Sequence, residues 1–212
     1  MSRFMVFVFE GIDGTGKSTV SKMVFDYYSS IFPGKVFLFS EPSDTGFGKR
    51  IRDILKYSDF NLNIFEQVLL FDADRSYFVR NVLLPVMKSD NIVIVDRSFI
   101  STYAYQILNV DDEDLRKLLV DITEFSTNGV FFDVVLFFDC DVEVSLSRRK
   151  ERDNFESKGV GFLNRVRENY KKFLLGSHKK IGRVVIIDAS KPLDEVYNDV
   201  LNVFREFVGD VV

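Results

Sequence analysis

The sequence contains few of the residue types that build metal centres and disulfides. It has one cysteine, one histidine and no tryptophan. The single cysteine, Cys140, cannot form an internal disulfide, which favours a reducing compartment. One cysteine and one histidine also cannot supply a zinc site, or a catalytic group that needs a second such residue. The histidine, His178, stands between a serine and two lysines, so we expect it at the surface.

Long apolar runs and an excess of positive charge are missing as well. No segment approaches the roughly 20 apolar residues of a membrane-spanning helix. The apolar start, residues 1–9, is too short for a signal peptide with its cleavage site, so we expect a cytoplasmic protein. The net charge is −4. We therefore expect neither a membrane nor a nucleic acid as partner.

The chain alternates between two patterns. Short apolar runs rich in β-formers lie at residues 3–9, 36–40, 92–96, 134–139 and 184–188. Helical patterns lie at residues 17–29, 47–56, 64–88, 112–126, 142–150, 161–174 and 193–208. This alternation predicts an α/β three-layer sandwich with a five-stranded parallel sheet, formed by one domain over residues 1–212. In the helix at 112–126, four apolar residues follow the spacing i, i+3, i+4, i+7, which predicts one buried stripe: Leu115, Leu118, Leu119 and Ile122.

A phosphate-binding loop follows the first strand. Gly11, Gly16, Lys17 and Ser18 match the pattern G-x-x-x-x-G-K-[ST] of P-loop NTPases. Its backbone N–H groups and the following helix N-terminus attract phosphates. Lys17 would bridge the β- and γ-phosphates of ATP, and Ser18 would ligate Mg²⁺. The expected ATP-binding residues are Gly11, Ile12, Asp13, Gly14, Thr15, Gly16, Lys17, Ser18 and Thr19.

Three charged residues near strand ends extend this site. Asp13, inside the loop, is either a turn-former or a group that faces a sugar hydroxyl or water on Mg²⁺. Asp96 ends the third strand, where a carboxylate can hold water on Mg²⁺. Arg97 follows it with a planar fork that suits a phosphate, although a surface ion pair is the alternative. A metal site at Ser18 and Asp96 is therefore expected.

Aromatic and polar residues could form a second pocket. Phe71 and Arg75 are four residues apart on one helix face and could hold a base, although a phenylalanine at this spacing also suits a core. The pair Glu41-Pro42 directly follows the second strand. Residues 101–106 are rich in hydroxyls and could either line a pocket or cap a helix.

Together these motifs resemble the thymidylate kinase family, whose members phosphorylate dTMP to dTDP with ATP and Mg²⁺. The matching segments occur in order along nearly the whole chain: residues 9–19, 41–42, 71–75, 96–97, 101–106, 148–152 and 187–189. The resemblance implies a cis peptide before Pro42, a homodimer formed around residues 64–84, and a lid at about residues 148–160. Arg148 and Arg152 of this lid would join Asp13, Lys17 and Arg97 as catalytic residues.

The resemblance also implies a role for each residue of the dTMP site. Asp13 would contact the 3′-hydroxyl, and Arg97 with Arg52 would hold the phosphate. Phe71 would stack on thymine while Arg75 bonds its O4 edge. The remaining substrate-binding residues would be Glu41, Pro42, Ser101, Thr102, Tyr105 and Gln106, with Thr102 and Gln106 at the base edge and Tyr105 against the 2′ position.

Two departures from the bacterial pattern leave alternatives open. Asn154 stands where many relatives have arginine, and Ser43-Asp44 replaces two glycines. A kinase for another nucleoside monophosphate, such as dUMP, is one alternative. A non-enzymatic nucleotide switch is another, but the guanine-reading sequence Asn-Lys-x-Asp of GTPases is missing.

Overall fold

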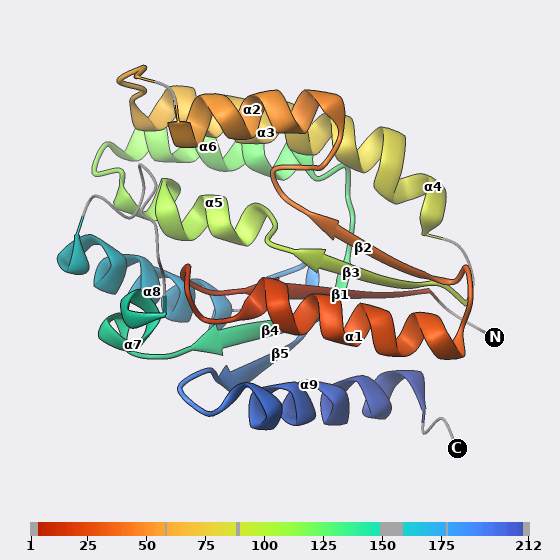
Figure 1. The fold of residues 1–212 in the computed structure, drawn as a ribbon. Coiled ribbons are helices and arrows are strands. Elements are labelled where there is room, and N and C mark those ends of the chain that lie inside the picture. The colour runs from red at the N-terminus through yellow and green to blue at the C-terminus, as the bar shows by residue number, and fades with distance from the viewer. Residues whose placement is uncertain (1–3, 58, 88–89, 149–158, 177, 210–212) are drawn as a thin grey trace.

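The computed structural model describes residues 4–57, 59–87, 90–148, 159–176 and 178–209 (Figure 1). Five parallel strands form one sheet in the order β2-β3-β1-β4-β5, which confirms the predicted fold class. The strands are β1 (Met5–Glu10), β2 (Val36–Ser40), β3 (Ile92–Asp96), β4 (Phe132–Asp139) and β5 (Ile181–Asp188). β1 lies at the centre, with Phe9 paired to Asp96 of β3 and to Leu136 of β4.

Helices cover both faces of this sheet (Figure 1). α1 (Lys17–Ile31) and α9 (Leu193–Val208) pack on one face, around the core residues Phe7, Phe9 and Phe204. α5 (Phe99–Tyr105) and α8 (Val160–Leu174) pack on the other face, where Val6 and Val8 point. Successive side chains of β1 thus point to opposite faces of the sheet and pack into two separate apolar cores.

Further helices lie beyond α5 on that second face. They are α2 (Gly46–Tyr57), α3 (Ile64–Phe78) and α6 (Glu113–Ser126). The helix α3 begins at a capping box formed by Asn63 and Glu66. The short helix α7 (Val142–Ser147) follows β4 and leads toward α8.

The sequence predicted one helix over residues 64–88, and the chain is helical without a break from Ile64 to Val86, but the irregularity inside this stretch was not predicted. After α3 the chain makes a π-turn at η1 (Val79–Leu83) and a last short turn, α4 (Leu84–Val86). Pro85 has no N–H to donate, so the regular bonding of an α-helix cannot continue through it. The helix α5 and the short 3₁₀ turn η2 (Ile107–Asn109) were not predicted.

Two predictions of exposure were wrong. Leu118 is 48% exposed, because the buried side of α6 is formed by Leu119 together with Thr123 and Ser126. His178 is largely covered, with its ring centroid 5.0 Å from that of Phe173 and its Nε2 3.3 Å from Glu124. Burial lowers the pKa of His178, although Glu124 opposes this.

Candidate active site

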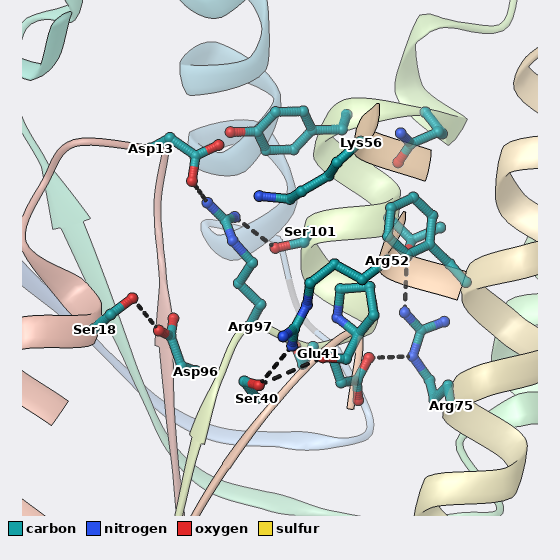
Figure 2. Close-up of a pocket in the computed structure, with 16 residues that line it drawn as sticks. Asp13, Ser18, Ser40, Glu41, Arg52, Lys56, Arg75, Asp96, Arg97 and Ser101 are labelled. Carbon is teal, nitrogen blue, oxygen red and sulfur yellow. Dashed lines mark hydrogen bonds and ion pairs between the residues drawn. The ribbon is translucent and has the colours of Figure 1, made fainter. Parts of the chain in front are cut away.

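Two clefts meet at the carboxyl ends of the strands. One, of about 490 Å³, lies over the phosphate-binding loop, and the other, of about 400 Å³, lies beside it (Figure 2). Asp13, Ser18 and Arg97 line both clefts. Two ligands that occupied the two clefts would therefore meet at these three side chains.

The phosphate-binding loop needs its glycines for two reasons. A Cβ on Gly11 would lie 2.5 Å from the carbonyl oxygen of Phe138, so the loop can pass β4 only without a side chain. Gly14 and Gly16 have φ of 84° and 87°, in the left-handed region that glycine adopts without strain. The predicted residues from Asp13 to Thr19 line the first cleft, while Ile12 is buried behind it.

Lys17 lies at the floor of the first cleft and is 4% exposed. Its Nζ donates to the carbonyl oxygen of Ile12 at 2.7 Å and to Oγ1 of Thr15 at 3.3 Å. Burial lowers the pKa of Lys17 to about 8, and the positive charge of Arg97 adds to this effect. A polyphosphate in the cleft would raise this pKa again, because it favours the charged ammonium.

The oxygens of Ser18 and Asp96 form a pair that suits Mg²⁺. Oγ of Ser18 donates to Oδ2 of Asp96 (Figure 2), and Oδ1 of Asp96 is buried with no hydrogen-bond partner among the described residues. Mg²⁺ prefers such oxygen ligands, takes few of them from the protein and keeps several waters. The described residues contain no cluster of three potential metal ligands, so a site here would depend on phosphate and water oxygens as well.

Arg97 stands at the junction of the two clefts. Its Nη2 lies 2.5 Å from Oδ1 of Asp13, and its Nη1 lies 3.1 Å from the carbonyl oxygen of Gly11 and 3.1 Å from Oγ of Ser101. Burial opposes its charge, yet Asp13 and other neighbours hold the pKa of Arg97 well above its ordinary value. The backbone of Arg97 has φ of 72°, an uncommon conformation for a residue with a side chain.

Phe71 and Arg75 of α3 line the second cleft, as their spacing predicted. Arg75 is 2% exposed and donates through Nε to Glu41 at 2.8 Å and through Nη2 to Thr102 at 2.8 Å. Burial raises the pKa of Glu41 to about 7, against the opposite effect of Arg75. These bonds fix the guanidinium plane beside the cleft (Figure 2). The peptide between Glu41 and Pro42 is cis.

The other predicted substrate residues also line the second cleft. They are Glu41, Pro42, Arg52, Ser101, Thr102, Tyr105 and Gln106. Arg52 donates to Asp44 at 3.1 Å, to Ser40 at 3.0 Å and to the carbonyl oxygen of Pro42. Asp44, which belongs to the Ser43-Asp44 departure from the bacterial pattern, is therefore one of three groups that orient this arginine.

The structure adds residues that the sequence did not suggest. Lys56 lines the second cleft and is four residues after Arg52, on the same face of α2 (Figure 2). Ser40 and Ser98 line it as well. The far end of the first cleft is formed by the segment after β5: Lys191, Pro192, Leu193 and Val196. Proximity to the carboxyl ends of β2 and β5 was the available signal for most of them.

Of the two arginines predicted for the lid, one lies in the described part of the chain. Arg148 lines the first cleft and donates to the carbonyl oxygens of Ala189 and Ser190, at 2.6 and 3.1 Å. Arg152, Asn154 and most of the predicted lid lie outside the described residues.

The sequence and the fold are similar to those of known proteins. A family model described as thymidylate kinase matches residues 9–200. A thymidylate kinase from Thermosipho melanesiensis is 36% identical over 200 residues, covering 92% of this chain and 95% of that protein. One from Finegoldia magna is 35% identical over 207 residues, covering 95% of this chain and 98% of that protein. The crystal structure of thymidylate kinase from Ehrlichia chaffeensis superposes with a TM-score of 0.73 at 25% identity, covering 95% of this chain and 99% of that one.

Proposed function

The chain belongs to the thymidylate kinase family and phosphorylates dTMP to dTDP at the expense of ATP, and we propose that it does so across the two adjoining clefts. This assignment rests on one observation: Asp13, Ser18 and Arg97 line both clefts. Two phosphate chains laid end to end would meet there. Holding both reactants in line supplies much of the acceleration that phosphoryl transfer requires.

In this proposal the first cleft binds ATP. The loop from Gly11 to Thr19 surrounds the phosphates with backbone N–H groups, and Lys17 contacts the β- and γ-phosphates. Ser18 and Asp96 would hold Mg²⁺, which neutralises charge on the phosphates when it is bound. This assignment is supported by Oδ1 of Asp96, which is buried and accepts no hydrogen bond from the part of the chain that the structure describes. Arg148 would contact the nucleotide from the other side of the cleft.

The second cleft binds dTMP. Arg97 and Arg52 would hold its phosphate, with Ser101 beside them, and Asp13 would accept a bond from the 3′-hydroxyl. Phe71 would stack on the base, while Arg75 donates to O4 of thymine. Glu41 accepts from this arginine at the wall of the cleft, and the carbonyl oxygen of Pro42 accepts from Arg52. Tyr105, Thr102 and Gln106 would fix the sugar and the base edge.

The transfer itself needs no covalent intermediate on the protein. An oxygen of the dTMP phosphate attacks the terminal phosphorus of ATP as the bond to ADP breaks. Lys17 and Arg97 would approach the transferring group from the ATP cleft and from the junction of the clefts, and they would stabilise the charge that spreads over it. Arg152 of the predicted lid would add a further cation.

Three wider features complete the proposal. The whole chain would act as one domain in the cytoplasm. Among the described residues, no helix is long and apolar enough to span a membrane.

A homodimer would form along α3. The apolar side chains of Leu69 and Tyr77 on α3, and of Leu84 on α4, are 38–42% exposed. Phe47 of α2 extends this apolar strip, with its ring centroid 5.5 Å from that of Tyr77.

The assignment is tested by ADP release, coupled to NADH oxidation, with dTMP, dUMP, dCMP and thymidine as acceptors. We expect the highest kcat/KM with dTMP. Thymidine should give almost no turnover, because it lacks the phosphate that Arg97 and Arg52 would bind. Thymidine turnover comparable to that of dTMP would contradict the proposed acceptor cleft. Higher kcat/KM for dUMP would instead revise the base specificity.

A further inference from the structure

A buried carboxylate lies directly behind the phosphate-binding loop. Glu10 ends β1, immediately before Gly11, and is 0% exposed. It is not among the described residues that line either cleft. A buried carboxylate is costly unless it is paired and hydrogen-bonded. A role for Glu10 therefore has to come from its contacts with other residues and not from contact with a substrate.

Three hydroxyl groups satisfy Glu10. Oγ of Ser98 donates to Oε1 at 2.7 Å, while Oγ of Ser101 and the hydroxyl of Tyr170 donate to Oε2 at 2.7 and 2.9 Å. Burial raises the pKa of Glu10, and Arg97 and these three hydroxyls act in the opposite direction. An ionised carboxylate accepts hydrogen bonds only, which suits this set of donors.

Two of these hydroxyls also accept from Arg97. Nη1 of Arg97 lies 3.1 Å from Oγ of Ser101 and 3.3 Å from the hydroxyl of Tyr170. Each hydroxyl can therefore accept a bond from the guanidinium and donate one to Glu10. The carboxylate acts on Arg97 through one intervening hydroxyl, so it compensates the positive charge without occupying the donors that face the cleft.

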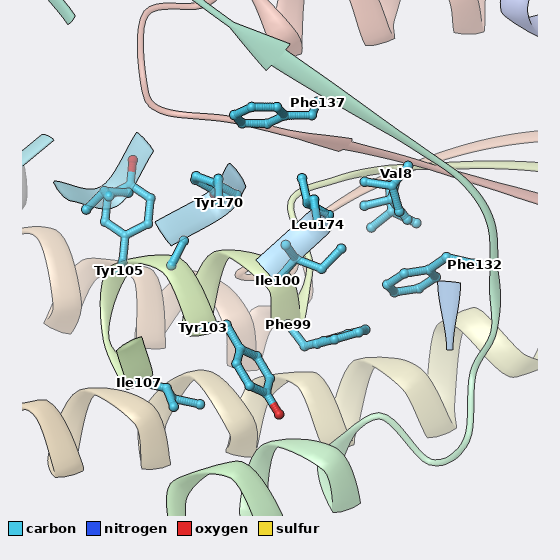
Figure 3. Packing of buried hydrophobic residues seen from close by; sticks show 14 of the residues in the cluster. Val8, Phe99, Ile100, Tyr103, Tyr105, Ile107, Phe132, Phe137, Tyr170 and Leu174 are labelled. Atoms are coloured by element: carbon cyan, nitrogen blue, oxygen red, sulfur yellow. The ribbon is translucent and has the colours of Figure 1, made fainter. Parts of the chain in front are cut away.

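Tyr170 brings a second element into this arrangement. It lies on α8, is 0% exposed, and packs with its ring centroid 5.4 Å from that of Phe137 and 6.2 Å from that of Tyr105 (Figure 3). The ring of Tyr105 in turn lies 5.6 Å from the guanidinium carbon of Arg97. Packing thus fixes the hydroxyl of Tyr170 against Nη1 of the arginine, whereas Asp13 accepts from Nη2.

We propose that Glu10 and Tyr170 are positioning residues that hold the guanidinium of Arg97 ready for the acceptor phosphate. This inference rests on the proposed role of Arg97 in binding dTMP. A long arginine side chain loses rotamer entropy when it binds, and an orientation fixed in advance avoids that cost. Loss of either residue should therefore lower kcat/KM for dTMP and leave the Kd for ATP unchanged.

Tyr170→Phe keeps the ring and removes the hydroxyl. We expect kcat/KM for dTMP to fall on the order of tenfold, as for loss of a hydrogen bond to a charged group, with the Kd for ATP unchanged. Glu10→Gln should cause a fall on the order of a hundredfold, because one amide half cannot accept the hydroxyl bonds. Tyr28→Phe is the matched control, since Tyr28 is equally buried but lies on α1 in the other core.

The decisive experiment repeats Tyr170→Phe in an Arg97→Ala background and compares kcat/KM for dTMP. If Tyr170 acts through Arg97, its loss should cost nothing further there. A similar fold loss in both backgrounds, or no loss in either, would overturn the inference. Absence of dTMP turnover by the wild-type enzyme would instead refute the proposed function, so the two failures are distinguishable.

Discussion

Replacing Arg97 by alanine tests the acceptor cleft most directly. A guanidinium has five N–H donors. The two on Nη1 and one on Nη2 point at protein acceptors, namely Gly11, Ser101, Tyr170 and Asp13. Counting bonds to described residues, two donors remain for a phosphate. At about 1.5–3 kcal/mol for each charge-assisted bond, their loss costs about 3–6 kcal/mol. The expected fall in kcat/KM for dTMP is then about 10²- to 10⁴-fold.

The assay is coupled ADP release at varied dTMP, together with calorimetric titration of ATP. Arg97→Ala should keep a Kd for ATP close to the wild-type value, because Lys17 and the backbone N–H groups of the phosphate-binding loop remain. Arg183→Ala is a suitable control, since Arg183 is 51% exposed on β5 and pairs with Glu206 at the surface. If Arg97→Ala keeps kcat/KM within about threefold of the control, Arg97 does not donate two hydrogen bonds to the acceptor phosphate.

Three further predictions concern other parts of the site. The Kd for ATP should rise with pH above about 8, by up to tenfold per pH unit, because Lys17 must be protonated to bind the phosphates as an ammonium. A Kd that stays constant in titrations from about pH 7 to about pH 9.5 would contradict this. Gly48→Ala should lower the free energy of unfolding in urea by about 1–3 kcal/mol, because its Cβ would overlap Oγ of Ser43, whereas Gly46→Ala in the same helix meets nothing within 4 Å. Lys56→Met should raise KM for dTMP roughly fivefold and reduce its dependence on salt, as expected for a partly exposed ion pair; equal KM values for the variant and the wild type would exclude a role in phosphate binding.

Much of the fold could be predicted from the sequence because buried parallel strands are continuous apolar runs. The strands at 36–40 and 92–96 and the last helix match the structure residue for residue. β5 was predicted too short because it is an edge strand, and its first residues carry exposed side chains such as Arg183. The seven-residue helix α5 was missed since it is too short to show a helical period, and nearly all its residues are buried.

The site could be predicted in part because its residues follow strand ends or fit a contiguous motif. Lys17, Asp96 and Arg97 stand where the sheet places its ligands. Lys56 could not be foreseen in this way, since it depends on how α2 lies against the second cleft. Glu10 precedes the loop, but its bonds to Tyr170 span 160 residues of sequence. No local pattern in the chain carries that information.

The left-handed backbone of Arg97 has a consequence for the evolution and engineering of this enzyme. A glycine would adopt φ of 72° with less backbone strain, so the backbone alone favours the smallest residue at a position proposed to bind the acceptor phosphate with one of the longest. Arg97→Gly would relieve this backbone conformation, but it would also remove the bonds to Asp13 and Ser101 and the proposed contact with the acceptor phosphate. Variant libraries for the chain should therefore be screened for turnover before they are ranked by melting temperature.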